Sequence, residues 1–215
     1  IKEMIQTRRA IHRRPEVGWT EFETMWIVCS QLQKWGIPYL LGTKVINPSF
    51  VMGRYETEVK DAIQRAIRHG VPESFIEETE GYTGAVAIIE TGRPGPVTAF
   101  RCDMDALPVR ESDDPSHLPA KEGFASELPG VMHACGHDGH MAMALAAATF
   151  VDRTIREQPG AIKRNVLFVF QPAEETTGGA KTVCESGVFE RYEADRIFGF
   201  HVWPDLPANT LASCS

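Results

Sequence analysis

Five apolar residues in a row, VLFVF at 166–170, constrain the fold more than any other feature of the sequence. A strand with one face in water alternates apolar and polar residues, so an unbroken apolar run is typical of a strand buried on both faces of a sheet. Further strands are expected at 37–41, 84–90, 97–102 and 197–202, and helices at 1–13, 20–35, 59–67, 141–157 and 178–186. This alternation predicts a layered α/β fold with a partly parallel sheet.

Local signals refine two of these elements. The turn-forming segment TGRPGP at 91–96 separates two predicted strands, so we expect 84–90 and 97–102 to pair as a hairpin. Thr20 followed by Glu23 matches a capping box, which predicts that Thr20 caps the second helix.

Composition excludes several classes of protein. Lys and Arg number 22 against 29 Asp and Glu, a formal net charge of −7, which argues against nucleic-acid binding. The longest nearly apolar stretch, 141–151, is too short to span a bilayer, so no membrane partner is expected. Five cysteines without framework-like spacing favour a reducing, cytoplasmic location over a disulfide-bonded scaffold.

The block HACGHDGH at 133–140 concentrates metal-binding side chains. Cys135 and His137 are the candidate ligands, because thiolate and imidazole bind first-row metals and Gly136 leaves room for both to reach one ion. His133 and His140 are weaker candidates, and His140 could be a partly exposed residue of a first helical turn. Cys135 could alternatively be a catalytic nucleophile.

Acidic and imidazole groups follow three of the predicted strands, where α/β proteins bind ligands. Asp103 and Asp105 follow strand 97–102, and one could face a site while the other braces the loop. Glu174 and Glu175 follow the apolar strand, where one could bind a cation and the other transfer a proton, although they could instead stabilise a helix N-terminus. His201 closes the last strand and could be a core histidine. Together these groups exceed a single catalytic zinc site and favour a two-metal hydrolytic site.

These motifs resemble those of a known family. The segments HRRPE at 12–16, DMDALP at 103–108, MHACGHDGH at 132–140, QPAEE at 171–175 and HVW at 201–203 are similar to the M20 metallopeptidases, in the amidohydrolase branch that contains hippurate and indoleacetyl-amino acid hydrolases. Loop segments at 45–49, 52–53, 81–84, 91–96, 116–117 and 123–126 resemble the A-subunit type of p-aminobenzoyl-glutamate hydrolase within that branch.

The resemblance implies a role for each matching residue. Cys135, His137, Glu175 and His201 match the metal ligands. Glu174 matches the general base that activates the attacking water, and Asp105 matches the acid that orients the metal site.

The implied reaction is hydrolysis of the amide between an acyl group and an amino acid. Its cofactors are two divalent ions, with manganese the first choice and zinc the second. The implied partners are a small N-acyl amino acid and a second subunit, in a homodimer or a heterodimer with a related chain.

The resemblance also implies a domain boundary. Family members insert a lid domain after the segment that matches His201 and then return to the catalytic domain with a further histidine ligand. We therefore expect residues 1–215 to be the N-terminal part of the catalytic domain, unable to complete the metal site alone.

Several functions remain open on sequence grounds. The substrate could be p-aminobenzoyl-glutamate or another N-acyl amino acid such as a benzoyl or indoleacetyl conjugate. A non-catalytic metal-binding subunit is a further possibility, although such a subunit would have no need of Glu174. A structural thiol–histidine metal domain would require a closed set of four ligands.

Overall fold

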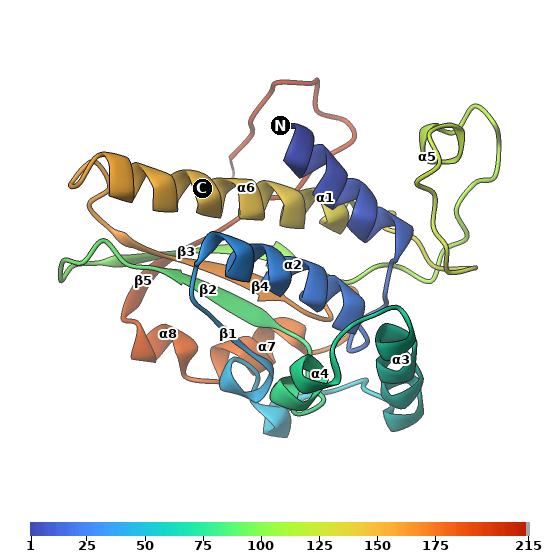
Figure 1. Cartoon of the computed structure of the whole chain (residues 1–215), viewed down its shortest axis with the longest axis horizontal. Helices are drawn as coiled ribbons and strands as arrows, with labels where there is room; N and C mark the ends of the chain where they lie inside the picture. The colour runs from blue at the N-terminus through green and yellow to red at the C-terminus, as the bar shows by residue number, and fades with distance from the viewer. Residues whose placement is uncertain (214–215) are drawn as a thin grey trace.

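A five-stranded mixed sheet forms the centre of the computed structural model, which describes residues 1–213 (Figure 1). Its spatial order is β1-β2-β4-β3-β5. β3 runs parallel to β4 and β5, whereas β2 is antiparallel to both β4 and β1. The strands are β1 (Tyr39–Leu41), β2 (Ala85–Ile89), β3 (Val97–Asp103), β4 (Asn165–Gln171) and β5 (Ala194–Gly199). The predicted layered α/β fold with a partly parallel sheet is confirmed.

The apolar run forms the central strand β4, and its side chains enter two separate cores. Val166, Phe168 and Phe170 belong to the core beneath α1, α2 and α6. Leu167 and Val169 belong to the core on the opposite face, beneath α7 and α8. Burial on both faces therefore explains why this strand has no polar residue between Asn165 and Gln171.

The predicted hairpin between 84–90 and 97–102 is wrong, because β4 lies between β2 and β3. The turn after β2 crosses the end of β4 instead: the Asn165 side chain accepts hydrogen bonds from the Thr91 main-chain N and Oγ1, both 2.8 Å long. A turn-forming segment indicates that the chain reverses direction, but it does not determine which strands pair with each other. The most apolar strand takes the position that buries both of its faces.

Helices cover both faces of the sheet (Figure 1). α1, α2 and α6 pack on one face, and α7 and α8 on the other, while α3, α4 and α5 lie at the periphery. None of the described helices is long and apolar enough to cross a bilayer. The helices are α1 (Lys2–Arg13), α2 (Phe22–Trp35), α3 (Glu56–Arg68), α4 (Glu73–Thr79), α5 (Leu118–Lys121), α6 (His137–Glu157), α7 (Gly179–Cys184) and α8 (Val188–Arg191), with short 3-10 turns η1 (Gly42–Lys44) and η2 (Pro48–Phe50).

The predicted capping box is also wrong. Glu21 is the N-cap residue of α2, and its side chain makes no capping hydrogen bond. Thr20 donates to the main-chain oxygen of Val17 at 2.7 Å, and Glu23 pairs with Arg65 and His69. Glu23 therefore bonds residues that are distant in the sequence, and the Glu21 carboxyl does not cap its own helix.

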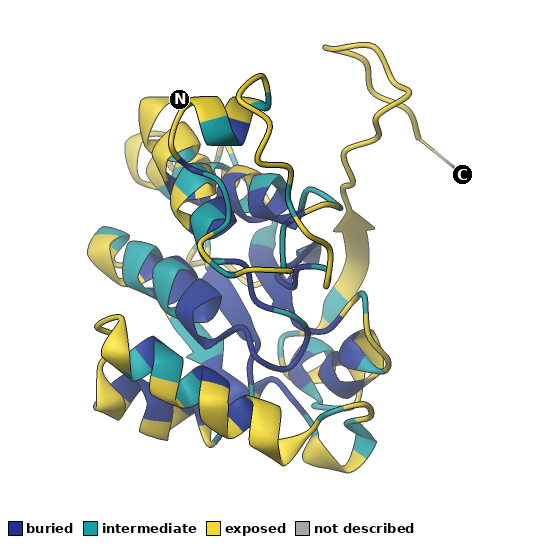
Figure 2. Ribbon diagram, turned by 90° about the vertical axis from the view of Figure 1, so that its right-hand side faces the viewer, coloured by how far each residue is buried: buried dark blue, intermediate teal, exposed yellow. Residues whose placement is uncertain are grey.

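The outer edge of the sheet differs from its centre. β5 is almost entirely exposed, including the large apolar side chains of Ile197 and Phe198 (Figure 2). The segment after it, with Phe200 and Trp203, is equally exposed. An apolar edge strand with one free side is a surface that proteins normally cover.

Candidate metal centre

The parallel strands bring three of the sequence motifs to one edge of the sheet. Asp103, the last residue of β3, pairs with Gln171, the last residue of β4, so the segments 103–105 and 172–175 leave the sheet side by side. β5 runs parallel to β3 and leads to His201. α6 begins at the same edge with His137, immediately after Gly136 in the left-handed conformation (φ 89°).

His137 lies at the centre of this edge and is fully buried. Its Nδ1 donates to the main-chain oxygen of Asp105 at 2.7 Å. A carbonyl oxygen can only accept, so Nδ1 carries a proton, and in the neutral ring Nε2 carries the lone pair that a cation would bind. Nε2 lies 3.8 Å from Asp103 Oδ2, 3.8 Å from Glu175 Oε1 and 4.0 Å from Glu174 Oε2. Two ligands bound to one zinc-like ion lie about 3–4 Å apart, so these separations suit a shared cation.

Cys135 and His201 form the exposed side of the centre. The Cys135 Sγ lies 3.3 Å from His201 Nε2. His201 Nδ1 donates to the main-chain oxygen of Val202 at 2.6 Å, which directs its Nε2 toward the thiol. Cys135, His137 and His201 each offer one atom within a common 4.8 Å cluster, as do His137, Glu174 and Glu175.

Glu174 and Glu175 lie in a turn between β4 and α7. α7 begins only at Gly179, so the alternative that these acids stabilise a helix N-terminus is wrong. The main-chain N of Glu175 donates to Asp105 Oδ2 at 2.8 Å. Asp105 thus contacts both His137 and the acidic turn, so it braces the loop while it faces the site.

The donor set fits a divalent cation. Asp103 Oδ2, Asp105 Oδ1, His137 Nε2 and Glu175 Oε1 are buried and have no hydrogen-bond partner among the described residues. Burial and nearby carboxylates raise the pKa of Asp103 to about 6. Burial, Glu175 and Glu174 raise the pKa of the Cys135 thiol to about 12. A cluster that disfavours its own negative charge gains most from a bound cation.

His140, a weaker candidate on sequence grounds, is a member of the centre. It is buried rather than partly exposed, and its Nε2 accepts from the main-chain N of Val202 at 3.0 Å. Asp103, His137 and His140 form a third cluster of possible ligands. The spacing of one helical turn between His137 and His140 was the available signal.

His133 is buried outside these clusters. Burial lowers its pKa to about 4, and its ring lies 6.4 Å from that of His12. Among the described residues, His133 therefore belongs to none of the candidate ligand clusters.

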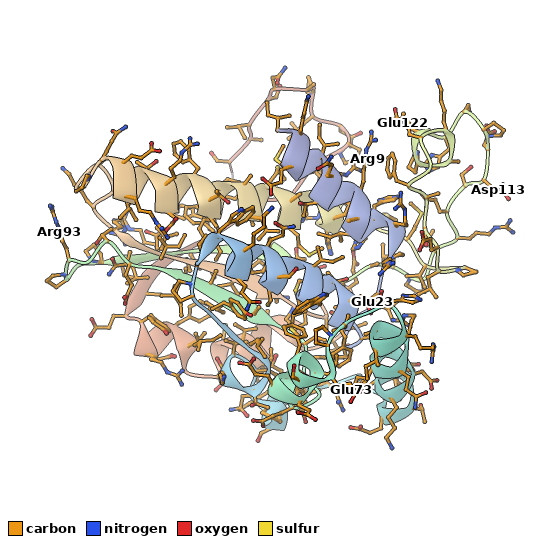
Figure 3. All side chains as sticks on the ribbon, viewed as in Figure 1. Arg9, Glu23, Glu73, Arg93, Asp113 and Glu122 are labelled. Atoms are coloured by element: carbon orange, nitrogen blue, oxygen red, sulfur yellow. The ribbon has the colours of Figure 1, made fainter. Side chains whose placement is uncertain are left out.

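A second network, which the sequence did not reveal, supports the start of α6. His12 bonds Asp138 Oδ2 and Glu111 Oε1, each at 2.9 Å. Burial by itself lowers the pKa of His12, but these two carboxylates outweigh it and raise that pKa. On the exposed side, Arg9 of α1 pairs with Glu122 just after α5 (Figure 3). α1 therefore ties the long loop 107–131 to the metal-binding segment.

Comparison with known proteins identifies the family. Residues 99–214 match the model of peptidase family M20/M25/M40. The chain belongs to this family. The matched part contains every residue of the candidate metal centre, and the resemblance inferred from the sequence motifs is confirmed.

Three relatives show how far the likeness extends. The chain is 42% identical over 213 residues to indole-3-acetyl-aspartic acid hydrolase of Enterobacter agglomerans, covering 98% of this chain and 48% of the relative. It is 41% identical over 206 residues to a p-aminobenzoyl-glutamate hydrolase subunit of Escherichia coli, covering 95% and 46%. A solved structure of the Bacillus subtilis YXEP protein, described as a dinuclear metal binding peptidase from the M20 family, matches with a TM-score of 0.70 and 32% identity, covering 96% of this chain and 44% of that one. The chain thus spans about half the length of these relatives.

Proposed function

We propose that the protein is a metal-dependent amidohydrolase that cleaves small N-acyl amino acids. The observation that carries this proposal is the convergence of Glu174 and Glu175 within 4.0 Å of His137 Nε2. Cys135, His137, Glu175 and His201 are the proposed ligands of two divalent ions, with Mn²⁺ preferred over Zn²⁺. A dinuclear relative supports the number of ions, and the mixture of carboxylate, imidazole and thiol donors suits either metal.

The surroundings of Glu174 and Glu175 support a different role for each. Bound divalent ions supply the positive charge that makes water acidic and stabilises a developing oxyanion. The Glu174 side chain is 37% exposed, whereas that of Glu175 is 21% exposed and faces Cys135 and His137. We assign Glu174 as the base that takes the proton of the attacking water and returns it to the leaving amine.

Asp105 positions these groups rather than transferring protons. It contacts the His137 ring through its main-chain oxygen and holds the main-chain N of Glu175 through its carboxylate. Arg101 also lies at the site, and its Nη2 is 3.9 Å from Glu174 Oε1.

The preferred substrate is p-aminobenzoyl-glutamate, and indole-3-acetyl-aspartate is the alternative. The loop motifs favour the former, while the two relatives that carry these names are about equally similar to the chain. The test is to measure kcat/KM for both conjugates and for hippurate, using the full-length protein loaded with Mn²⁺. No turnover of any of the three would refute the amidohydrolase proposal.

A non-catalytic metal-binding subunit is the competing function, because one relative is named as one subunit of an enzyme. The experiment that separates the two is Glu174→Ala in the full-length protein. Loss of turnover with Mn²⁺ still bound would support catalysis. Activity that persisted after loss of the metal would contradict the assigned roles.

We further propose that residues 1–215 are the N-terminal part of the catalytic domain and that additional polypeptide covers β5. The exposed apolar residues of β5 and the partial coverage of the relatives support this. A hollow of about 550 Å³ between α6 and the segment after β5, with His140 and His201 on its wall, is the adjoining open surface. We expect no detectable amidase activity from the isolated 215-residue chain.

Assembly and location complete the proposal. We propose a homodimer, or a heterodimer with a related subunit, in the cytoplasm. The name of the Escherichia coli relative supports a multimer, and the four cysteines within the described residues are free thiols, as expected in a reducing compartment. Light scattering of the purified full-length protein tests the first point, and cell fractionation tests the second.

A further inference from the structure

We propose that Glu21 is a positioning residue that fixes the main chain on the N-terminal side of the catalytic base Glu174. The inference rests on the proposed function, in which Glu174 acts as the base. It adds a residue from a different part of the chain, 152 positions before its partner, to the machinery of the site.

The contacts of Glu21 point at the acidic turn. Its carboxyl group is fully buried, and Oε1 accepts a hydrogen bond from the main-chain N of Ala173 at 2.8 Å. Oε2 is hydrogen-bonded to Thr83 Oγ1 at 2.6 Å, and Thr83 is itself fully buried. Both oxygens are therefore held, and one of them holds the residue immediately before Glu174.

Ala173 needs such a partner. Its φ is +52°, in the left-handed region, which is unfavourable for a residue with a Cβ. β4 ends at Gln171, so the sheet no longer provides an acceptor for the Ala173 N–H. A buried N–H without an acceptor would destabilise this conformation further, because the lost hydrogen bonds to water would not be replaced.

Glu174 thus lies between two amides that are both held by carboxyl groups. Glu21 holds the N–H of Ala173, and Asp105 holds the N–H of Glu175 at 2.8 Å. The two anchors restrain the main chain on either side of the base. Small displacements of a reacting group are costly, since a shift of about 1 Å can reduce a rate roughly 10²-fold.

The segment that carries Glu21 is built to lie against this turn. Gly18 has no room for a side chain, because a Cβ there would lie 2.4 Å from Thr176 Oγ1 and 2.9 Å from the Ala173 Cα. The main-chain oxygen of Glu16 accepts from Ala106 N at 2.7 Å. Residues 16–21 therefore contact both the loop after β3 and the loop after β4.

The state of the carboxyl group suggests which variant can replace it. Burial and the charge of Asp105 raise the pKa of Glu21, so a neutral side chain of the same shape is a suitable replacement. Oε1 accepts from the Ala173 main chain, and Oε2 accepts from the Thr83 hydroxyl, a group that can also act as an acceptor. Glutamine can accept from Ala173 through its oxygen and donate to the Thr83 hydroxyl through its nitrogen, whereas alanine can do neither.

The test compares Glu21→Ala and Glu21→Gln in the full-length Mn²⁺-loaded protein, with Glu16→Ala as the matched control. Glu16 is a buried glutamate of the same segment, but its side chain bonds Thr24 and Arg65 rather than the acidic turn. Rates are measured per folded molecule on p-aminobenzoyl-glutamate and indole-3-acetyl-aspartate. We expect Glu21→Ala to lower kcat about 10- to 100-fold with less than a threefold change in KM. Glu21→Gln should stay within about threefold of the wild type, as should the kcat of Glu16→Ala.

An unchanged kcat for Glu21→Ala, or an equal loss of kcat in Glu16→Ala, would overturn the proposal. A failure of Glu21→Gln to restore the rate would also overturn it, because the hydrogen-bond pattern would then not be the cause.

Amide hydrogen exchange of residues 173–176 is the second readout and does not depend on the reaction. Exchange there should accelerate in Glu21→Ala only. If the wild type hydrolyses neither conjugate, the proposed function fails, and the exchange data alone decide whether Glu21 fixes this turn. Unchanged exchange in Glu21→Ala would refute the positioning role.

Discussion

The two sides of the metal centre are held in different ways. On the inner side, Asp103, Asp105 and His137 are fully buried, and hydrogen bonds from the protein fix His137 and the acidic turn. On the outer side, His201 follows an exposed edge strand and bonds only its neighbour Val202 and the Cys135 thiol among the described residues. The inner side is therefore organised by the core of this chain, whereas the outer side lies where we propose that further polypeptide covers β5.

The largest effect expected from the inner side is on catalysis. Glu174→Gln removes the proposed base but keeps the size of the side chain, so kcat should fall about 10³-fold or more while Mn²⁺ remains bound. Steady-state kinetics and metal analysis of the full-length protein provide the measurement. A variant that retained about a tenth of the wild-type rate would show that another group takes the proton.

A pair of histidine variants tests the difference between the two sides directly. In the metal-free protein, His137→Ala removes a fully buried side chain and leaves the main-chain oxygen of Asp105 without its donor, so it should lower the free energy of unfolding by about 2 kcal/mol. His201→Ala removes an exposed ring and should cost less than about 0.5 kcal/mol. Urea unfolding measures both. Equal losses would mean that the outer side is as firmly organised as the inner one.

The buried acids should also give the protein a characteristic pH dependence. The folded-state pKa of Glu21, about 8, lies above its ordinary value of 4.5, so the folded state binds a proton that the unfolded state releases. Stability is therefore greatest below about pH 4.5 for this group and falls as the pH rises to about 8, by at most about 1.4 kcal/mol per pH unit.

Glu21→Gln has no proton to lose in this range, so its free energy of unfolding should fall less steeply with pH than that of the wild type. The comparison uses metal-free protein and urea unfolding at several pH values between about 5 and 8. Asp103 and Glu16, whose pKa values are raised to about 6 and about 7, are present in both proteins, so the comparison isolates the contribution of Glu21. Parallel curves would place the raised pKa elsewhere.

The smallest effect concerns the outer edge. In the 215-residue chain, Ile197→Thr changes a side chain that is 57% exposed and should alter stability by no more than about 0.5 kcal/mol. In the full-length protein the same change should cost more than about 1 kcal/mol if further polypeptide buries β5. An equal cost in both would contradict the proposal that β5 is covered.

The sequence alone determined the fold class and most of the centre. The unbroken apolar run at 166–170 required a strand buried on both faces, and the strand-end motifs required a common edge. The spacing of Cys135 and His137, with the acids after the strands, predicted which residues gather there. The types of donor and their local spacing can be read from residues that are neighbours in the sequence.

Only the tertiary structure decided which strands are neighbours and which distant groups support the site. β4 separates two strands that local signals paired, because burial of both its faces outweighs a short connection. The Glu21 side chain bonds the Ala173 main chain instead of capping its own helix, and His140 is buried in the centre, where it bonds the Val202 main chain. Both partners lie far away in the sequence. A pattern of neighbouring residues does not record such contacts, which form only when the sheet brings the ends of its parallel strands together.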